Sequence, residues 1–272
     1  MIDPIVTVDW LTDHRDDVTV CDVRYYLDGR SGPAAFEAGH LPGAVYIDMD
    51  TVLASPAGPI VGRHPMPTPE VFASGLGRAG VADHATVVVY DDLGGMVAGR
   101  LVWMLRIIGQ PAALLDGGFT SWTGDIETGR GARPIPVSRS VVEWPTDAMA
   151  SADEVAAAIE AGVVVADSRA GDRYRGEIEP IDAKAGHVPG AISLPFSVNL
   201  DQGRFRPVDE LRRRFDEAGI DGDGIVYCGS GVSACNNLLA IEAAGLGRPR
   251  LYVGSWSGWS SDPDRPVATT EQ

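Results

Sequence analysis

The stretch GHLPGA at residues 39–44 returns almost unchanged as GHVPGA at residues 186–191. Two more pairs of matching stretches flank it in the same order: VCDVR at 20–24 with VADSR at 165–169, and TVVVYD at 86–91 with GIVYC at 224–228. Each half then continues through a glycine loop, a helical pattern, a short strand and a tryptophan. Landmarks that recur in one order indicate that the chain is a duplication.

Each half alternates short apolar strands with helices. Strands are expected where short, β-branched runs are bounded by turn residues: Val18–Asp22, Thr86–Tyr90, Ala112–Leu115, Val163–Asp167, Gly224–Tyr227 and Arg250–Val253. Helical patterns lie between them, at Val97–Ile108 and Ala234–Ala244, and each ends at a glycine. This alternation predicts the α/β class, with two domains that are each a parallel sheet flanked by helices.

The two domains are expected at residues 1–130 and 146–272. The stretch between them, residues 131–145, is rich in proline and has no clear period, which is typical of a linker.

Composition excludes several classes of partner. The 272 residues carry 38 acidic and 22 basic side chains, a formal net charge of −16, which argues against nucleic acid and anionic membranes as partners. No apolar run is long enough to span a membrane, and no signal peptide is visible at the N-terminus. An odd number of cysteines, Cys21, Cys228 and Cys235, is no disulfide framework, so we expect a reducing, cytoplasmic setting.

One of these cysteines lies where ligands bind in α/β proteins. Cys228 follows a buried strand and precedes a helix that begins near Ser233. Gly229 and Gly231 let backbone N–H groups turn into the loop as an anion-binding nest. The positive end of the helix dipole favours a thiolate over a thiol. The pattern predicts a sulfur nucleophile held by N–H donors, and a merely buried cysteine would need neither glycine nor helix start.

Three other chemistries fit the loop less well. The glycine spacing matches a loose dinucleotide fingerprint, but the next strand ends without the ribose-binding acid. A cysteine phosphatase would need an arginine where Ala234 stands. Cys228 and Cys235 are too far apart in sequence for a paired zinc motif. In the first half Asp91 replaces the cysteine, so we expect only the second half to be catalytic.

With these motifs the chain resembles the rhodanese superfamily of sulfurtransferases in its tandem form, over essentially its whole length. The loop CGSGVSA at residues 228–234 is similar to the CGSGVTA signature of 3-mercaptopyruvate sulfurtransferases, with Ser233 in place of threonine. Thiosulfate-specific relatives usually carry basic residues directly after the cysteine, where this chain has Gly229 and Ser230. The resemblance therefore favours 3-mercaptopyruvate as donor, with thiosulfate second. It implies that Gly229, Gly231, Val232 and Ser233 contact the donor.

The resemblance also implies roles outside the loop. Arg173 matches the family arginine that holds the donor's carboxylate, a role that suits a planar guanidinium. A second arginine of mercaptopyruvate enzymes is absent, because Ile181 or Asp182 stands in its place.

Three further residues, Asp50, His64 and Ser230, match family positions that work together to activate the donor or the cysteine. We therefore expect Cys228, Ser230, Asp50 and His64 to be the catalytic residues.

The implied function is a sulfurtransferase that moves a sulfur atom through a persulfide of Cys228. The acceptor would be cyanide or a thiol such as thioredoxin or glutathione. No metal and no organic cofactor is implied. The alternative is a binding module that carries sulfur or senses persulfides without turnover, or a phosphatase that would hydrolyse an aryl phosphate.

Overall fold

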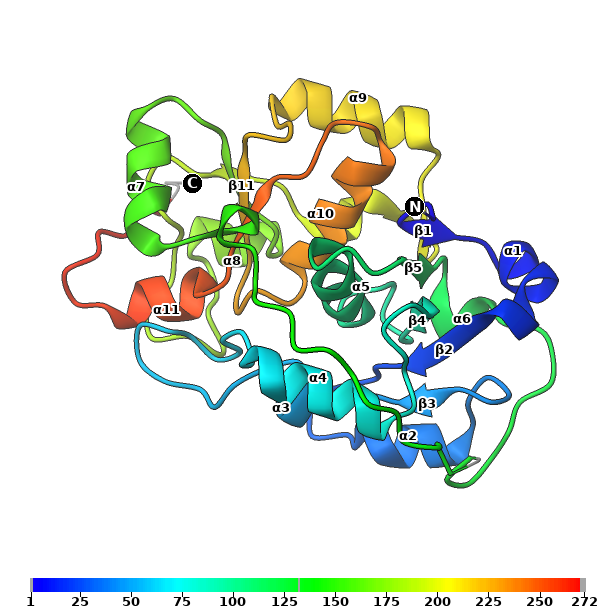
Figure 1. The fold of residues 1–272 in the computed structure, drawn as a ribbon. Coiled ribbons are helices and arrows are strands. Elements are labelled where there is room, and N and C mark those ends of the chain that lie inside the picture. Colours follow the sequence, from blue (N-terminus) through cyan, green and yellow to red (C-terminus); the bar gives the residue numbers. More distant parts are fainter. Residues whose placement is uncertain (1, 132, 270–272) are drawn as a thin grey trace. The chain divides into compact units, whose positions relative to one another are not determined.

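The computed structural model describes residues 2–131 and 133–269, which form two compact units. Unit 1 comprises the chain up to Ser55 with Pro67–Trp144 and Gly203–Phe205. Unit 2 comprises Pro56–Met66, Pro145–Gln202 and the chain from Arg206. Each unit contains one five-stranded sheet (Figure 1).

The sheet of unit 1 is parallel, with the strand order β1-β5-β4-β2-β3. Its strands are β1 (Ile5–Val6), β2 (Val18–Asp22), β3 (Val45–Tyr46), β4 (Thr86–Tyr90) and β5 (Ala112–Leu115), and unit 1 also contains β10 (Arg204–Phe205). Its helices are α1 (Val8–Asp13), η1 (Arg15–Asp17), α2 (Gly32–Ala38), α3 (Met49–Val52), α4 (Pro69–Arg78), α5 (Ala98–Ile107) and α6 (Gly118–Ser121).

Helices cover both faces of this sheet. Val88 and Tyr90 of β4 pack in one cluster with Leu11 of α1 and Phe36 of α2. The alternating residues of β4 are buried as well, and α5, buried along nearly its whole length, contacts β4 and β5. Strands buried on both faces explain the continuous apolar runs in the sequence.

The sheet of unit 2 repeats this topology with the order β6-β12-β11-β7-β8. Its strands are β6 (Met149–Ala150), β7 (Val165–Asp167), β8 (Ile192–Ser193), β11 (Ile225–Tyr227) and β12 (Arg250–Tyr252), and unit 2 also contains β9 (Leu200–Asp201). Its helices are η2 (Thr146–Ala148), α7 (Ala152–Glu160), α8 (Gly171–Arg175), η3 (Phe196–Asn199), α9 (Val208–Ala218), α10 (Ala234–Ala243) and α11 (Ser255–Ser261).

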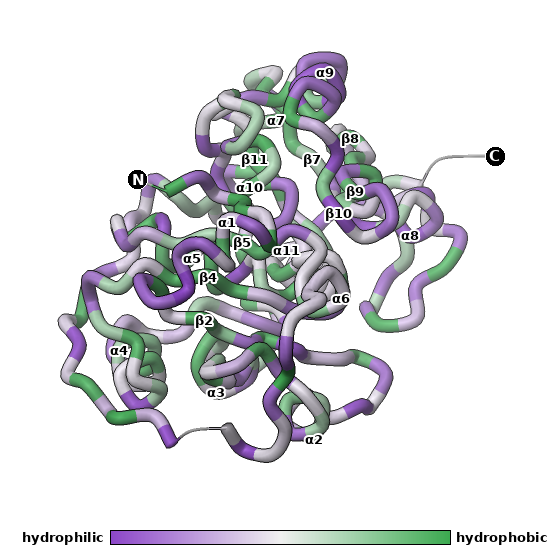
Figure 2. Tube along the Cα trace, turned by 90° about the vertical axis from the view of Figure 1, so that its right-hand side faces the viewer, coloured by the Kyte–Doolittle hydropathy of each residue, from purple (hydrophilic) through white to green (hydrophobic). Residues whose placement is uncertain are grey.

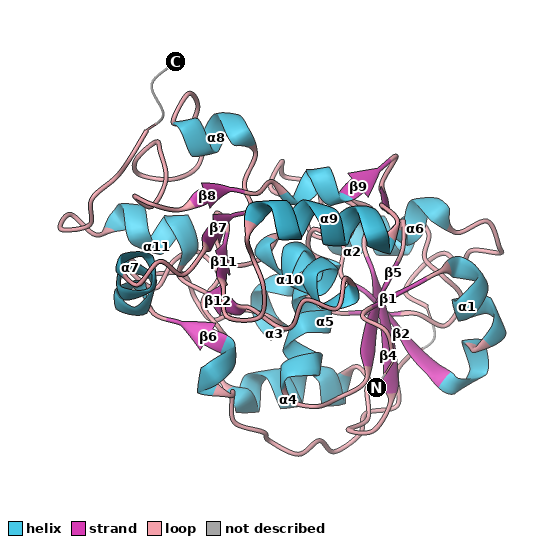
Figure 3. Ribbon diagram, turned by 90° about the horizontal axis from the view of Figure 1, so that it is seen from above, coloured by secondary structure: helices cyan, strands magenta, loops and turns pink. Residues whose placement is uncertain are grey.

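In unit 2, α7 and α11 pack in one apolar cluster with the sheet, and α10 contacts β11 and β12. Figure 3 shows β7, β11 and β12 side by side among these helices. The helix α9 is largely hydrophilic along its length (Figure 2), and only its Leu211 and Phe215 are buried. The expected α/β class, with a parallel, helix-flanked sheet in each half, is confirmed.

The duplicated motif has the same structural role in both units. The ring of His40 donates through Nδ1 to the carbonyl of Phe36 at 2.9 Å, and His187 does the same to Tyr174 at 2.7 Å. The amide after each histidine donates at 3.1 Å to a strand tyrosine, Tyr90 in unit 1 and Tyr227 in unit 2. These histidines are structural, since each is buried and tied to backbone.

All six predicted strands agree with the structure to within two residues at each end, and three of them, β2, β4 and β5, match at both ends. The strands at the sheet edges, β1, β3, β6 and β8, were not predicted. Each is only two residues long, so no alternation or apolar run marks it in the sequence.

A short piece of the N-terminal half belongs to unit 2. Residues 58–62 form an isolated antiparallel bridge that lies against α11. A methyl group at Gly62 would lie 2.6 Å from the carbonyl of Gly254, and one at Gly258 would lie 2.3 Å from the carbonyl of Ile60. The backbone N–H of Arg63 donates to Ser257 Oγ at 3.1 Å. Such close approach requires glycine on both sides of the contact.

Among the described residues, no helix combines the length and the apolar character that crossing a membrane requires.

Candidate active site

The loop after β11 is held by hydrogen bonds to α11. The backbone N–H of Cys228 donates to Ser255 Oγ at 3.2 Å, and the amides of Trp256 and Ser257 donate at 2.9 Å to the carbonyls of Cys228 and Gly229. Only 1% of Cys228 is exposed. The loop is thus fixed through its own backbone.

Ser255 has a backbone conformation that is rare for serine. Its φ is +51°, in the left-handed region, whereas the preceding Gly254 has an ordinary φ of −57°. Unit 1 has a glycine, Gly118 with φ +54°, at the corresponding place, where the amide of Phe119 donates to the carbonyl of Asp91. The serine therefore holds a strained conformation and supplies the hydroxyl that accepts from the Cys228 amide.

The loop of unit 1 shows what such a loop binds. Four backbone amides, those of Leu93, Gly95, Val97 and Ala98, donate to the carboxylate of Asp91 at 2.8–2.9 Å. Burial raises the pKa of Asp91 and these four bonds oppose that rise. The loop between strand and helix is therefore a cradle for an anion, as the glycine pattern predicts.

The loop of unit 2 has the same position between β11 and α10. Gly231 has φ +73°, Ser233 precedes the first residue of α10, and Val232 is buried. Cys235 lies in the first turn of α10 with Sγ 3.5 Å from the carbonyl of Gly231, so it is a packed thiol.

His64 and Ser230, which are far apart in the sequence, lie together in unit 2. His64 Nδ1 is 2.8 Å from Ser230 Oγ, and both side chains are buried. Asp50 lies in unit 1, in the first turn of α3, and burial together with the neighbouring Asp48 raises its pKa, which a hydrogen bond from Tyr25 partly offsets.

Arg173 is positioned by two buried carboxylates. Its Nη2 donates to Glu179 Oε1 at 2.6 Å and to Asp182 Oδ2 at 3.0 Å. Glu179 also accepts from Arg169, whose guanidinium forms a buried bidentate pair with Asp167. The charged groups around the loop are therefore a connected network that fixes the direction of Arg173.

Sequence reasoning missed a second arginine at this loop. Arg63, beside His64 in the sequence, forms an ion pair with Asp182 through Nη1. A methyl group at Gly229 would lie 2.9 Å from Arg63 Nη2 and 3.5 Å from Arg173 Nη1. The only signal in the sequence was its position next to His64.

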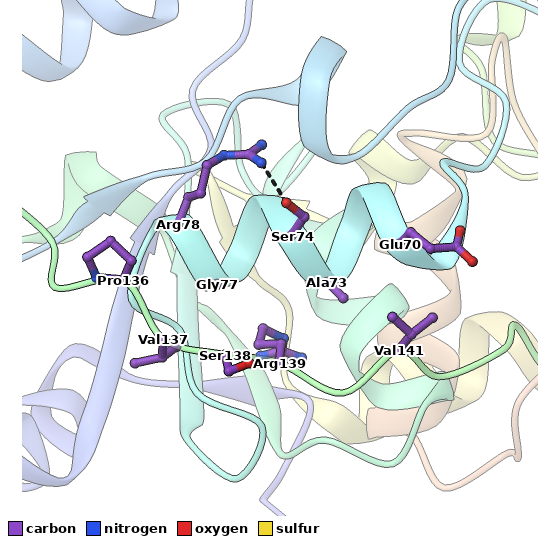
Figure 4. Close-up of a pocket in the computed structure, with 10 residues that line it drawn as sticks. All are labelled: Glu70, Ala73, Ser74, Gly77, Arg78, Pro136, Val137, Ser138, Arg139 and Val141. Carbon is purple, nitrogen blue, oxygen red and sulfur yellow. Dashed lines mark hydrogen bonds between the residues drawn. The ribbon is translucent and has the colours of Figure 1, made fainter.

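One open groove of unit 1 differs in its lining residues from the Cys228 loop. Its cavity of about 410 Å³ lies between α4 and the stretch 136–141, with Arg78 Nη1 donating to Ser74 Oγ at 2.6 Å (Figure 4). Its lining contains no cysteine and no histidine, whereas Cys228 belongs to unit 2. Among the described residues, no group of three or more His, Cys, Asp or Glu side chains is arranged to hold a metal ion.

The geometry can be compared with known proteins. The model of the rhodanese-like domain matches residues 7–125 and 151–262. The chain is 39% identical over 263 residues to a probable 3-mercaptopyruvate sulfurtransferase of Pseudomonas aeruginosa, with 93% of each chain covered. It is 40% identical over 262 residues to a putative thiosulfate sulfurtransferase of Mycobacterium tuberculosis, covering 93% of this chain and 91% of that one.

A solved structure has a similar fold. A 3-mercaptopyruvate sulfurtransferase from Leishmania major superposes with a TM-score of 0.82 at 30% identity, over 94% of this chain and 73% of that one.

Proposed function

Because the chain belongs to the rhodanese-like family and is a sulfurtransferase, we propose that it moves sulfur from 3-mercaptopyruvate to an acceptor through a persulfide on Cys228. The single observation that carries this proposal is the Cys228 loop, a buried cysteine between β11 and the first turn of α10. In the equivalent loop of unit 1, four backbone amides donate to the carboxyl group of Asp91. Thiosulfate is the second donor.

Loading is a displacement at the donor's sulfur. The Cys228 thiolate forms an S–S bond as the C–S bond of mercaptopyruvate breaks, and the donor's carbon takes the thiol proton, so pyruvate leaves and a persulfide anion remains. With thiosulfate the S–S bond of the donor breaks and sulfite leaves. Both steps conserve charge, and amide donors of Gly229, Gly231, Val232 and Ser233 would stabilise the anion.

The remaining residues assist this step. Ser230 and His64 share a hydrogen bond of 2.8 Å, so a proton can pass between the donor, the hydroxyl and the imidazole. Asp50 is proposed to act with them. Arg173 would bind the donor's carboxylate, which a guanidinium can hold in a bidentate manner.

The neutral residues after the cysteine favour mercaptopyruvate over thiosulfate. Gly229 and Ser230 add no positive charge directly beside Cys228. Thiosulfate, a dianion, would need such a charge more than a donor with a single carboxylate does. Relatives named for either donor resemble the chain to a similar degree, so the proposal of mercaptopyruvate rests on this local chemistry.

In the second half of the reaction the persulfide gives its outer sulfur to cyanide or to a thiol such as thioredoxin or glutathione, and the thiolate is regenerated. Cys21, Cys228 and Cys235 are free thiols, which fits a reducing, cytoplasmic compartment.

Intact-protein mass after brief exposure to each donor tests the proposal. We expect a gain of one sulfur atom with 3-mercaptopyruvate, a slower gain with thiosulfate, and none in the Cys228→Ala variant. Addition of dithiothreitol should then return the original mass. A protein that gains no sulfur from either donor would instead be a binding module without turnover.

A further inference from the structure

The two arginines at the Cys228 loop share one arrangement. Each uses one side of its guanidinium for a buried carboxylate: Arg63 Nη1 for Asp182, and Arg173 Nη2 for both Glu179 and Asp182. Each directs another nitrogen towards Gly229, with Arg63 Nη2 and Arg173 Nη1 at 2.9 and 3.5 Å from a methyl group built there. Two guanidinium nitrogens, both hydrogen-bond donors, therefore converge on Gly229, the residue next to Cys228.

Asp182 ties the two arginines together. Its two oxygens are divided between them, Oδ1 to Arg63 and Oδ2 to Arg173, and only 3% of its side chain is exposed. Either Ile181 or Asp182 stands where a second donor-binding arginine was expected from the family pattern. The charge that this position lacks is supplied at the same loop by Arg63, from a segment more than a hundred residues earlier.

The local charge balance limits which donor fits. Arg63 and Arg173 carry two positive charges, and Glu179 and Asp182 carry two negative ones, so the four groups are neutral together. A small donor with one carboxylate and an uncharged thiol adds one negative charge to this site, whereas thiosulfate adds two.

We propose that Arg63 is the second donor-binding arginine of this enzyme and that Asp182 holds it in place, so that Arg63 and Arg173 clamp the carboxylate of a 2-oxo-3-thiol acid above Gly229. This inference rests on the proposed function. It assigns Arg63 to the loading half of the reaction, because the carboxylate that it would hold belongs to the sulfur donor. A side chain at position 229 would displace the guanidinium of Arg63 from this place.

The test separates loading from discharge. Arg63→Gln should raise the KM for 3-mercaptopyruvate about 10–100-fold, the effect of losing a charged hydrogen bond, with a smaller change in kcat. Once loaded at saturating donor and desalted, the variant should transfer its sulfur to dithiothreitol at the wild-type rate, because that step needs no carboxylate clamp. Arg63→Lys, which keeps the charge but not the planar fork, should recover part of the KM.

The matched control is Arg175→Gln, which removes an exposed arginine on α8 that pairs with Glu177. It should keep wild-type KM and kcat. If Arg63→Gln loads with an unchanged KM, or if its discharge is slowed as much as its loading, the assignment of Arg63 is wrong while the proposed function stands. If the wild-type protein takes no sulfur from either donor, the proposed function fails and this inference fails with it.

Discussion

Ser255 combines a strained backbone with a contact to the nucleophile's own amide. Its φ of +51° costs about 1–2 kcal/mol for a residue with a side chain. Its Oγ accepts from the Cys228 N–H and donates to the carbonyl of Tyr252. The hydroxyl thus supplies an acceptor that a glycine at this place, as in unit 1, could not supply.

We therefore expect an unusual order of stabilities for substitutions at this residue. Ser255→Ala removes the hydroxyl, leaves the buried Cys228 N–H without this acceptor and keeps the backbone strain, so it should destabilise the protein by about 1–3 kcal/mol. Ser255→Gly should be more stable than Ser255→Ala by about 1 kcal/mol, because it relieves the strain. Urea unfolding measures both, and an alanine variant as stable as the glycine variant would contradict the strain.

The three cysteines should differ in reactivity. Burial raises the pKa of Cys21 to about 12, with Asp22 adding to the rise, so at pH 8 only about one molecule in ten thousand carries its thiolate. Cys235 is enclosed by α10 and bonded to the Gly231 carbonyl. Brief alkylation at pH 8 followed by peptide mass mapping should label Cys228 first. Equal labelling of Cys21 in the folded protein would contradict its raised pKa.

At this scale the sequence predicted the residues that belong to a motif. Cys228, its loop and Ser230 stand in one contiguous stretch, and Arg173 and His64 were found by resemblance. Arg63 and Ser255 could not be predicted, because their importance comes from partners distant in the chain. The positive φ at Ser255 is hidden as well, since the neighbouring glycine would be the usual choice for it.

Among the elements, the central strands were predictable and the edge strands were not. β4 and β11 are buried along almost their whole length, and their sequences are almost continuously apolar. Edge strands such as β3 and β8 are held by pairing to one neighbour over two residues, and local sequence carries little information about that pairing.

The helix α7 depends on its first turn. Ser151 accepts from the amide of Glu154, and the Glu154 side chain accepts from the amide of Ser151, which together form a capping box. Ser151→Ala should cost about 1 kcal/mol of stability, because one amide of the first turn loses its acceptor. Urea unfolding of this variant should show the loss, with Thr123→Ala at an exposed loop position as the control. A midpoint equal to wild type would show that the cap is dispensable.

For the molecule as a whole, the duplication was readable but the composition of the two units was not. Repeated motifs mark two similar halves, yet residues 56–66 from the first half are part of unit 2. Nothing in the local pattern of this segment reveals its destination, since its contacts are glycines brought close to α11.

A protein beginning at residue 145 therefore lacks His64 and Arg63. We expect such a fragment, where it folds by circular dichroism, to form the Cys228 persulfide at least 10-fold more slowly than the full chain, because both proposed donor-side groups are gone. The fragment also lacks Asp50, so the full chain with Asp50→Asn, His64→Gln and Arg63→Gln is the control and should load at the same reduced rate. A folded fragment that loads as fast as the full chain would show that the segment is unnecessary.

The membership of residues 56–66 in unit 2 also determines when the contacts of unit 2 can form during translation. A ribosome makes Arg63 194 residues before Ser257, whose Oγ accepts from the backbone N–H of Arg63. At 5–20 residues per second the segment waits roughly 10–40 seconds for its partner. Unit 2 therefore gains the contacts between residues 56–66 and α11 only after α11 has been made.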